Sequence, residues 1–363
     1  MVQSLDTRLL AAQVIISGID GKERLTGDMR ALFKECPAGG VMLFRYNLDS
    51  ADSGIRNLTA EIAAFIAEYS GRETIAGGIS PFIAADHEGG SVCRLPPGIA
   101  DLPPPESYWQ MAQTGGRDAA CARVEMDSFG AGDVIADLGI NLNFAPVVEP
   151  LNAGNREFLD DRSFGPDAAF AAEASAAFIR GMERAGVLCV IKHFPGSAGK
   201  DPHRFPSVLN SSPDELAALT FPFAELVRRG QGRAVMAAHT LVPARDPFNV
   251  ASLSPEIMGQ WLRRETGFSG IIISDDFAMA AARCIVSREG GVVESSLSPE
   301  DAAVRSLAAG ADMILVWPPD LRNTHRAILE ALEDGELSGD RLREAAGRII
   351  FEKLRMGIIT DDE

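Results

Sequence analysis

Short apolar runs alternate with longer amphipathic stretches along the whole chain. We identify eight of the apolar runs as strands: residues 13–17, 40–44, 82–85, 140–145, 187–191, 234–237, 271–274 and 313–316. Stretches between them, such as 168–185 and 254–265, have the spacing of apolar residues that is typical of helices. The second stretch begins Ser254-Pro255-Glu256, which is a capping residue followed by a proline in the first turn.

This alternation predicts the fold class. Strands that are apolar along their whole length are buried on both faces, and helices between them indicate a parallel sheet that is covered on both sides. Eight such units predict an α/β protein with a closed (β/α)8, or TIM-like, barrel, and we assign residues 1–363 to a single domain. A doubly wound open sheet is the alternative, but no glycine-rich nucleotide motif follows the first strand.

A barrel of this kind carries its functional residues just after the carboxyl ends of its strands. The third predicted strand is followed by Asp86-His87-Glu88-Gly89-Gly90, the fifth by Lys192-His193, the sixth by His239 and the seventh by Asp275-Asp276. Four of the five histidines lie at such ends or in the loops that follow. We therefore expect polar side chains to gather at one rim of the barrel.

The loop after the fifth strand carries an aspartate and a histidine two positions apart. Pro195, Gly196 and Gly199 disfavour regular structure in this loop, and residues i and i+2 of an extended segment point the same way. Asp201 could therefore orient the imidazole of His203 and favour its charged form. A capped loop with a surface histidine is the alternative interpretation of this pair.

Asp275 follows the seventh strand, where its carboxylate could attack an electrophilic carbon over the barrel mouth. Alternatively, Asp275 or Asp276 caps a helix that begins at Phe277. A carboxylate nucleophile together with a histidine acid/base suits the cleavage of an acetal through a covalent intermediate. Asp86 and Arg94 could bind hydroxyl or acyl groups, or could form an ion pair that stiffens their loop.

The composition limits the classes of binding partner and the cellular compartment that we expect for this protein. The formal net charge of −17 argues against nucleic acid and against an anionic membrane surface, because both repel an acidic protein. The five cysteines include no CxxC pair, which favours buried thiols in a reducing compartment over disulfides or a zinc site. No signal peptide or transmembrane run is recognised, so we expect a cytoplasmic protein. His87, Glu88, His193 and His203 match no standard zinc spacing, so no metal is expected.

Five short motifs follow one another along the chain: D-x-E-G-G at 86–90, R-S-F-G at 162–165, K-H-F-P-G at 192–196, A-S-L-S-P at 251–255 and S-D-D-x-x-M at 274–279. With these motifs the chain resembles glycoside hydrolase family 3, and specifically the bacterial β-N-acetylglucosaminidases of the NagZ type. The resemblance runs from Gly39 to Leu315 and therefore covers nearly the whole chain.

The resemblance implies a role for each matching position. Asp275 matches the nucleophile of the family, and His203 with Asp201 matches the acid/base dyad of this subgroup. Five residues match positions that hold the N-acetylglucosamine unit: Asp86, Arg94, Arg162, Lys192 and His193. The resemblance also implies a single catalytic barrel, no metal or organic cofactor, and removal of N-acetylglucosamine from peptidoglycan fragments during cell-wall recycling. We expect a monomer whose partner is this small carbohydrate.

The chain departs from the family pattern in three places. In the dyad loop, Ser197-Ala198 replaces a His-Gly pair, the loop is slightly shorter and Pro202 lies inside the dyad. Ser91 stands where the family often has arginine, and the segment from Cys284 to Ser296 after the nucleophile is longer than usual. These departures remove no expected catalytic residue. Two alternatives stay open: a phosphorylase on the same scaffold, because a neutral imidazole does not repel phosphate, and a non-catalytic sugar-binding sensor.

Overall fold

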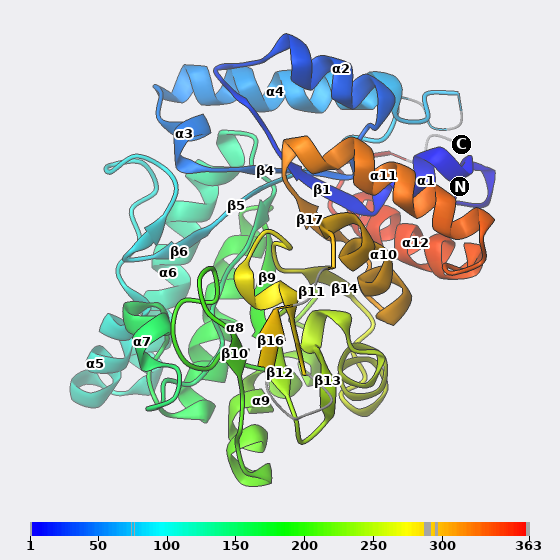
Figure 1. Cartoon of the computed structure of the whole chain (residues 1–363). Coiled ribbons are helices and arrows are strands. Elements are labelled where there is room, and N and C mark those ends of the chain that lie inside the picture. Colours follow the sequence, from blue (N-terminus) through cyan, green and yellow to red (C-terminus); the bar gives the residue numbers. More distant parts are fainter. Residues whose placement is uncertain (1, 74, 76, 287–291, 295–296, 361–363) are drawn as a thin grey trace.

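Eight parallel strands form the centre of the computed structural model, which describes residues 2–73, 75, 77–286, 292–294 and 297–360 (Figure 1). These strands are β1 (Ile15–Gly18), β4 (Gly40–Leu43), β5 (Phe82–Ala85), β8 (Leu142–Asn143), β9 (Leu188–Phe194), β11 (Ala234–Ala237), β14 (Ile271–Ser274) and β17 (Ile314–Val316). They are hydrogen-bonded in the order β14-β11-β9-β8-β5-β4-β1-β17. A parallel bridge between Ile273 and Met313 brings the two edge strands together, which confirms the predicted (β/α)8 barrel.

Each of the eight predicted runs contributes one strand, and β8 and β9 differ most in length from their predicted runs. β8 is shorter than predicted because the amide of Ala145 donates to the carbonyl of Asn143, so the chain turns before the apolar run ends. β9 is longer, because its pairing with β11 resumes at Phe194 after a register shift that passes over Lys192 and His193. The end of an apolar run therefore marks the change from apolar to polar residues. The hydrogen bonding between strands can stop before that point or continue beyond it.

Helices surround the strands on the outside of the barrel (Figure 1). They are α1 (Thr7–Gln13), α2 (Gly27–Glu35), α3 (Arg45–Leu48), α4 (Asp52–Tyr69), α5 (Pro105–Gly115), α6 (Arg117–Asp137), α7 (Arg156–Leu159), α8 (Ala168–Arg184), α9 (Pro213–Arg228), η4 (Pro255–Glu265), α10 (Pro299–Ala309), α11 (Pro318–Glu333) and α12 (Gly339–Arg355). The helices predicted at 168–185 and 254–265 are α8 and η4. Ser254 caps η4 as predicted, by accepting a hydrogen bond from the amide of Ile257 (3.1 Å). η4 is a π-helix, a wider winding that apolar spacing does not distinguish from an α-helix.

Shorter strands and single-turn helices lie in the connections. They are η1 (Val2–Ser4), β2 (Gly21–Lys22), β3 (Arg24–Leu25), β6 (His87–Gly89), β7 (Val92–Cys93), η2 (Asp160–Arg162), β10 (Ser207–Val208), β12 (Thr240–Val242), β13 (Asp246–Val250), η3 (Ala251–Leu253), η5 (Ala280–Arg283), β15 (Cys284–Val286) and β16 (Val292–Glu294). The hairpin β6–β7 directly follows β5, and β10, β12 and β13 form a separate small sheet. Apart from η1, which precedes α1 and contacts α12, these pieces build the loops above the carboxyl ends of the barrel strands.

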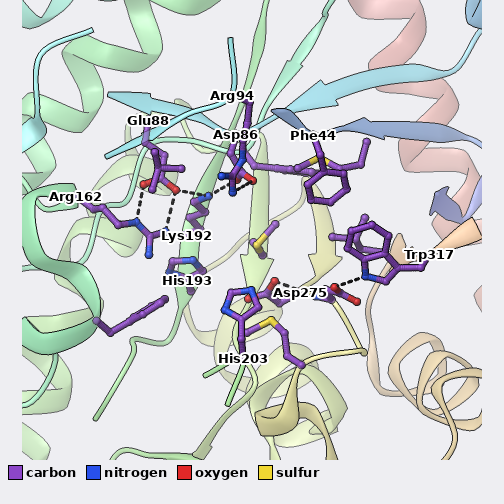
Figure 2. A pocket seen from close by; sticks show the side chains of 18 residues that line it. Phe44, Asp86, Glu88, Arg94, Arg162, Lys192, His193, His203, Asp275 and Trp317 are labelled. Atoms are coloured by element: carbon purple, nitrogen blue, oxygen red, sulfur yellow. Dashed lines mark hydrogen bonds and ion pairs between the residues drawn. The ribbon is translucent and has the colours of Figure 1, made fainter. Parts of the chain in front are cut away.

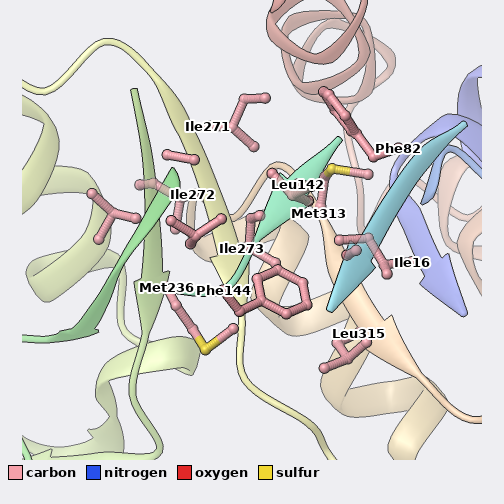
Figure 3. Packing of buried hydrophobic residues seen from close by; sticks show 14 of the residues in the cluster. Ile16, Phe82, Leu142, Phe144, Met236, Ile271, Ile272, Ile273, Met313 and Leu315 are labelled. Atoms are coloured by element: carbon pink, nitrogen blue, oxygen red, sulfur yellow. The ribbon is translucent and has the colours of Figure 1, made fainter. Parts of the chain in front are cut away.

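Apolar side chains from the strands pack together in the barrel interior (Figure 3). Ile16, Phe82, Phe144, Ile273 and Met313 are all buried there, although they come from distant parts of the sequence. Burial of this kind contributes roughly 25 cal/mol for each Å² of apolar surface removed from water. Among the described helices, none combines the length and the apolar content that a membrane span requires.

Candidate active site

A pocket of about 250 Å³ opens at the carboxyl ends of the strands (Figure 2). It collects seven of the eight residues that the sequence predicts for the site: Asp86, Arg94, Arg162, Lys192, His193, His203 and Asp275. The eighth, Asp201, reaches the pocket through its contact with His203. The polar rim that the strand-end rule predicts is therefore present, and segments more than a hundred residues apart meet in it.

Lys192, at the end of β9, joins two carboxylates inside the pocket. Its Nζ lies 2.7 Å from Oδ1 of Asp86 and 2.6 Å from Oε1 of Glu88, and its side chain is 3% exposed. Arg94 donates to Oδ2 of Asp86 over 3.2 Å. Arg162 donates to both oxygens of Glu88, over 2.8 and 2.9 Å. Figure 2 shows these five side chains as one connected network.

The network keeps both carboxylates ionised. Burial alone raises the pKa of Glu88, but the charges of Arg162 and Lys192 outweigh it and hold that pKa well below its usual range. Burial likewise raises the pKa of Asp86, and Lys192 and Arg94 reverse the shift. Nε of Arg94 is buried without a hydrogen-bond partner among the described residues. A cavity lined by fixed donors and acceptors of this kind suits a ligand with several hydroxyl or amide groups.

Glu149 holds His193, and the sequence interpretation missed it. Oε1 of this buried carboxylate lies 2.7 Å from Nδ1 of His193 and accepts a hydrogen bond from the His193 amide over 3.0 Å. It also accepts from Oγ of Ser197 over 3.0 Å. Burial raises the pKa of Glu149, but the bonds from His193 outweigh burial and lower it overall. Because Nδ1 is engaged, Nε2 of His193 is the ring nitrogen left for a ligand.

Asp201 and His203 form the predicted pair at the pocket rim. Oδ1 of Asp201 lies 2.7 Å from Nδ1 of His203 and accepts from the His203 amide over 3.0 Å. The side chains are 48% and 64% exposed, respectively. Burial raises the pKa of Asp201, but the hydrogen bonds and the charge of His203 reverse the shift and lower it. The ionised carboxylate thus fixes the ring, and Nε2 of His203 is left to exchange a proton.

The dyad loop is bonded to the segment that follows Asp275. The amide of Ala280 donates to the carbonyl of His203 over 3.2 Å, and the amide of Ala281 donates to the carbonyl of Pro202 over 3.0 Å. These two bonds connect the loop after β9 to the loop after β14. The relative position of His203 and Asp275 therefore depends on backbone contacts as well as on side chains.

Asp275 lies at the end of β14 and lines the pocket. Its Oδ1 accepts a hydrogen bond from the amide of Asp276 over 2.9 Å. The alternative role as the cap of a helix at Phe277 is wrong, because residues 277–279 form a turn and the next helical element is the short η5. Amides that a helix would use donate instead to the dyad loop.

Asp276, Trp317 and Phe44 line the pocket, although the sequence did not predict them there. Oδ2 of Asp276 accepts from Nε1 of Trp317 over 2.6 Å, and Oδ1 accepts from the amide of Ala278 over 2.8 Å. Burial raises the pKa of Asp276. Trp317 stacks on Phe44, and both rings line the pocket directly after β17 and β4.

The two remaining strand-end histidines lie outside the pocket lining. His239 is buried, with Nδ1 2.6 Å from Oγ of Ser252 and Nε2 3.0 Å from the carbonyl of Asp276. Nε2 of His87 lies 2.6 Å from the carbonyl of Ala100. Burial lowers the pKa of both imidazoles. Within the described ranges, no group of three His, Cys, Asp or Glu side chains is arranged to hold a metal ion.

Comparison with known proteins finds a matching family model and curated relatives. Residues 7–351 match the family model described as the glycosyl hydrolase family 3 N terminal domain. A beta-hexosaminidase of Stenotrophomonas maltophilia is 32% identical over 311 residues, which are 85% of this chain and 84% of the relative. A beta-hexosaminidase of Xanthomonas oryzae pv. oryzae is 33% identical over 343 residues, which are 92% of this chain and 90% of the relative.

Two solved structures share the fold. A glycoside hydrolase family 3 beta-N-acetylglucosaminidase from Paenibacillus sp. superposes with a TM-score of 0.83 at 29% identity over 99% of this chain, and this chain spans 64% of that longer one. NagZ from Neisseria gonorrhoeae, solved in complex with N-trifluoroacetyl-D-glucosamine, superposes with a TM-score of 0.74 at 30% identity, covering 93% of this chain and 89% of that one.

Proposed function

The chain belongs to glycoside hydrolase family 3, and from that premise we propose that this enzyme is a retaining exo-β-N-acetylglucosaminidase. One observation carries the proposal: a carboxylate, Asp275, and an aspartate-oriented imidazole, His203, line the same pocket as the charged network around Lys192. The names of the beta-hexosaminidase relatives and of the N. gonorrhoeae complex support an acetamido sugar as the terminal unit.

The first chemical step forms the covalent intermediate. A carboxylate oxygen of Asp275 attacks the anomeric carbon, and the bond from that carbon to the leaving oxygen breaks. Nε2 of His203 gives its proton to the leaving oxygen, so the alcohol departs neutral. Asp201 stabilises the imidazolium before transfer and keeps Nδ1 as its own donor.

The second step hydrolyses the intermediate. Nε2 of His203, now neutral, takes a proton from water, and the water oxygen attacks the anomeric carbon while the bond to Asp275 breaks. Two displacements at one carbon give a product with the original β configuration. The five residues proposed to hold the terminal sugar during both steps are Asp86, Arg94, Arg162, Lys192 and His193.

We extend the proposal to the biological substrate. N-acetylglucosaminyl muropeptides from peptidoglycan are the proposed natural substrates, processed during cell-wall recycling in the cytoplasm by a monomer whose residues 1–363 form one catalytic domain. The support for this part is the resemblance of the sequence motifs to the enzymes of the NagZ type, which implies this substrate and this role.

The test is turnover of an aryl N-acetyl-β-glucosaminide and of the matching aryl β-glucoside, each with and without phosphate. We expect the acetamido sugar to be preferred by roughly 100-fold or more in kcat/KM, because glucose leaves the polar groups of the site unpaired. Equal efficiency on both sugars would indicate a general β-glucosidase. Release of sugar 1-phosphate that depends on phosphate would indicate a phosphorylase, and tight sugar binding without turnover would indicate a sensor.

A further inference from the structure

The carboxylate of Glu149 contacts two different parts of the site. Oε1 meets Nδ1 and the amide of His193, which is proposed to hold the terminal sugar. Oε1 also accepts a hydrogen bond from Oγ of Ser197 over 3.0 Å, and Oε2 accepts one from the Ser197 amide. Ser197 lies at the start of the loop that carries Asp201 and His203. One side chain therefore anchors both a sugar-binding residue and the root of the dyad loop.

Backbone pairing places Glu149 at this junction. A parallel bridge joins Val147 to Lys192, so the chain that follows β8 runs beside the end of β9. Beyond β9, Gly196 adopts a φ of +139°, a conformation that a side chain would strain, and the residue after it reaches the same carboxylate. Two neighbouring strand ends thus meet at one buried side chain.

Only a carboxylate satisfies the groups around it. Because Glu149 is ionised, Nδ1 of His193 carries a proton, and all four groups that meet the carboxylate are hydrogen-bond donors. Glu149 is fully buried, and among the described residues its only ion-pair partner is His193. A buried charge that loses its donors is costly, so His193 and Ser197 are held firmly. Glu149 is not among the residues that line the pocket, so it acts through these two residues.

The dyad itself contributes little to the position of its loop. The side chains of Asp201 and His203 are 48% and 64% exposed, and an exposed pair of this kind adds little stability. The loop depends on other contacts: the carbonyls of Pro202 and His203 accept bonds from the segment after β14, and Ser197 is bonded to Glu149. Among these contacts, the bonds to Glu149 are made to a buried charge, and hydrogen bonds to charged groups are the strong ones.

We propose that Glu149 is a positioning residue that sets where the imidazole of His203 lies relative to the terminal sugar. Both His193 and His203 line the pocket (Figure 2), and fixing His193 and Ser197 to one carboxylate holds the sugar site and the dyad loop in register. A displacement of the loop by about 1 Å would misplace the proton donor, and catalysis is sensitive to such a shift. The inference rests on the proposed acid/base role of His203 and adds the residue that places it.

Glu149→Gln tests this with little change of shape. The new amide can keep its oxygen at the three donors around Oε1, but its NH2 group then meets the amide of Ser197, which is also a donor. We therefore expect His193 to stay in place and the dyad loop to shift. For methyl N-acetyl-β-glucosaminide, a poor leaving group that needs the proton, kcat/KM should fall about tenfold or more.

Two other measurements on Glu149→Gln should change little. For an activated aryl N-acetyl-β-glucosaminide, kcat/KM should fall less than about twofold, because its leaving group needs no proton. Inhibition by free N-acetylglucosamine should weaken less than about threefold, because the oxygen that holds His193 is kept. A merely structural role of Glu149 would not separate the two substrates.

Two further variants serve as a graded test and a control. Ser197→Ala removes one bond to Oε1 but keeps the amide bond, so only the methyl glycoside value should fall, about threefold. Ser163→Ala is the matched control: Oγ of Ser163 donates to the backbone carbonyl of Glu149 over 2.6 Å and is buried, but it does not touch the carboxylate. The ratio of the two kcat/KM values in this control should equal that of the wild type.

Other results overturn the inference. They are an equal fall for both substrates in Glu149→Gln, or an unchanged value for the methyl glycoside. If Glu149→Gln does not fold, Ser197→Ala decides, and an unchanged ratio of the two substrates would count against the inference. A wild-type chain that hydrolyses only the matching β-glucosides would overturn the proposed function alone, since the same ratio on those substrates still tests Glu149. A chain that hydrolyses none of these glycosides would overturn both.

Discussion

Two clusters of buried charge lie at opposite ends of the barrel and contain similar groups. At the carboxyl ends of the strands, Lys192 and two arginines contact Asp86 and Glu88. At the amino ends, three arginines surround one carboxylate, Asp312, which is fully buried just before β17. The arginines of this lower cluster are Arg263, Arg341 and Arg348.

The two clusters differ in what completes their hydrogen bonding. In the lower cluster, backbone carbonyls accept hydrogen bonds from arginine N–H groups that do not bond to Asp312. Arg341 donates to the carbonyl of Ala311 over 2.8 Å, and Arg263 donates to the carbonyl of Gly270. A cavity adjoins each cluster, and Arg263, Arg341 and Arg348 line the one at the lower cluster. The difference lies in the hydrogen bonding: in the upper cluster Nε of Arg94 is buried without a partner among the described residues. A cluster whose hydrogen bonds are all made within the protein stabilises the fold. A cluster at the carboxyl ends that keeps an unsatisfied hydrogen-bond donor can bind a ligand.

The largest expected effect is a loss of catalytic rate without a loss of stability, at the carboxyl ends of the strands. Asp275→Ala should lower kcat on an aryl N-acetyl-β-glucosaminide by roughly 10⁴-fold or more, because it removes the proposed nucleophile. The free energy of unfolding should change by less than about 1 kcal/mol, since the carboxylate ends a strand and faces a cavity. Steady-state rates and urea unfolding measure the two quantities. A rate near that of the wild type would rule out this assignment.

The lower cluster should show the reverse pattern. Asp312→Ala should lower the free energy of unfolding by about 3–5 kcal/mol, because three arginines lose a buried counter-ion. The kcat/KM of the folded enzyme should stay within about twofold. Glu344→Gln is the matched control: Glu344 pairs with Arg341 and Arg348 at the surface, so its loss should cost less than about 1 kcal/mol. Lost activity without lost stability in Asp312→Ala would contradict the comparison.

The rim dyad offers the next test, because its effect depends on the substrate. His203→Ala should slow a natural disaccharide roughly 100-fold, but slow an activated aryl glycoside far less in its first step, since a good leaving group needs no proton. Asp201→Asn should give a similar but smaller defect by misorienting the imidazole. Pre-steady-state rates on both substrates measure this. Equal slowing of both substrates would rule out His203 as the proton donor.

The smallest effect concerns Lys353, whose buried amine has no carboxylate partner among the described residues. Its Nζ donates to Gln13 over 2.9 Å, and burial lowers its pKa to about 7. In the unfolded chain the pKa is about 10.4. Between these two values the unfolded state binds more protons, so stability rises with pH over this window and is lost as pH falls toward 7.

Lys353→Met should remove this dependence. The free energy of unfolding of the wild type minus that of the variant should grow by about 1–2 kcal/mol between pH 7 and pH 8.5. Urea unfolding at the two pH values gives this difference, and the subtraction cancels the groups that both proteins share. A difference that does not change with pH would show that Lys353 stays charged in the folded protein.

The sequence predicted the barrel because its signal is local. Each strand is a short apolar run, and the rule that function follows strand ends placed Asp86, Lys192 and Asp275 at one rim. The dyad of Asp201 and His203 was also predictable, since its two members lie two positions apart.

The residues that were missed are defined by partners far away in the sequence. Glu149 has its partner, His193, 44 positions on, and Trp317 bonds to Asp276 over 41 positions. Neither residue belongs to a recognised motif. Each closely follows a predicted strand, however, so the rule that functional residues follow strand ends could have identified both as candidates. Two local expectations also needed correction: the alternative helix at Phe277 is a turn, and β9 includes Lys192 and His193.

The most direct test of the central claim is the mass of the Asp275 peptide during turnover. His203→Ala mixed with an aryl N-acetyl-β-glucosaminide should form the covalent intermediate readily but release it slowly, because the second step lacks its base. Acid quenching and peptide mass spectrometry should then find one N-acetylglucosaminyl group on the peptide that contains Asp275. A sugar attached to another residue, or product release with no adduct at any time, would contradict covalent catalysis by Asp275.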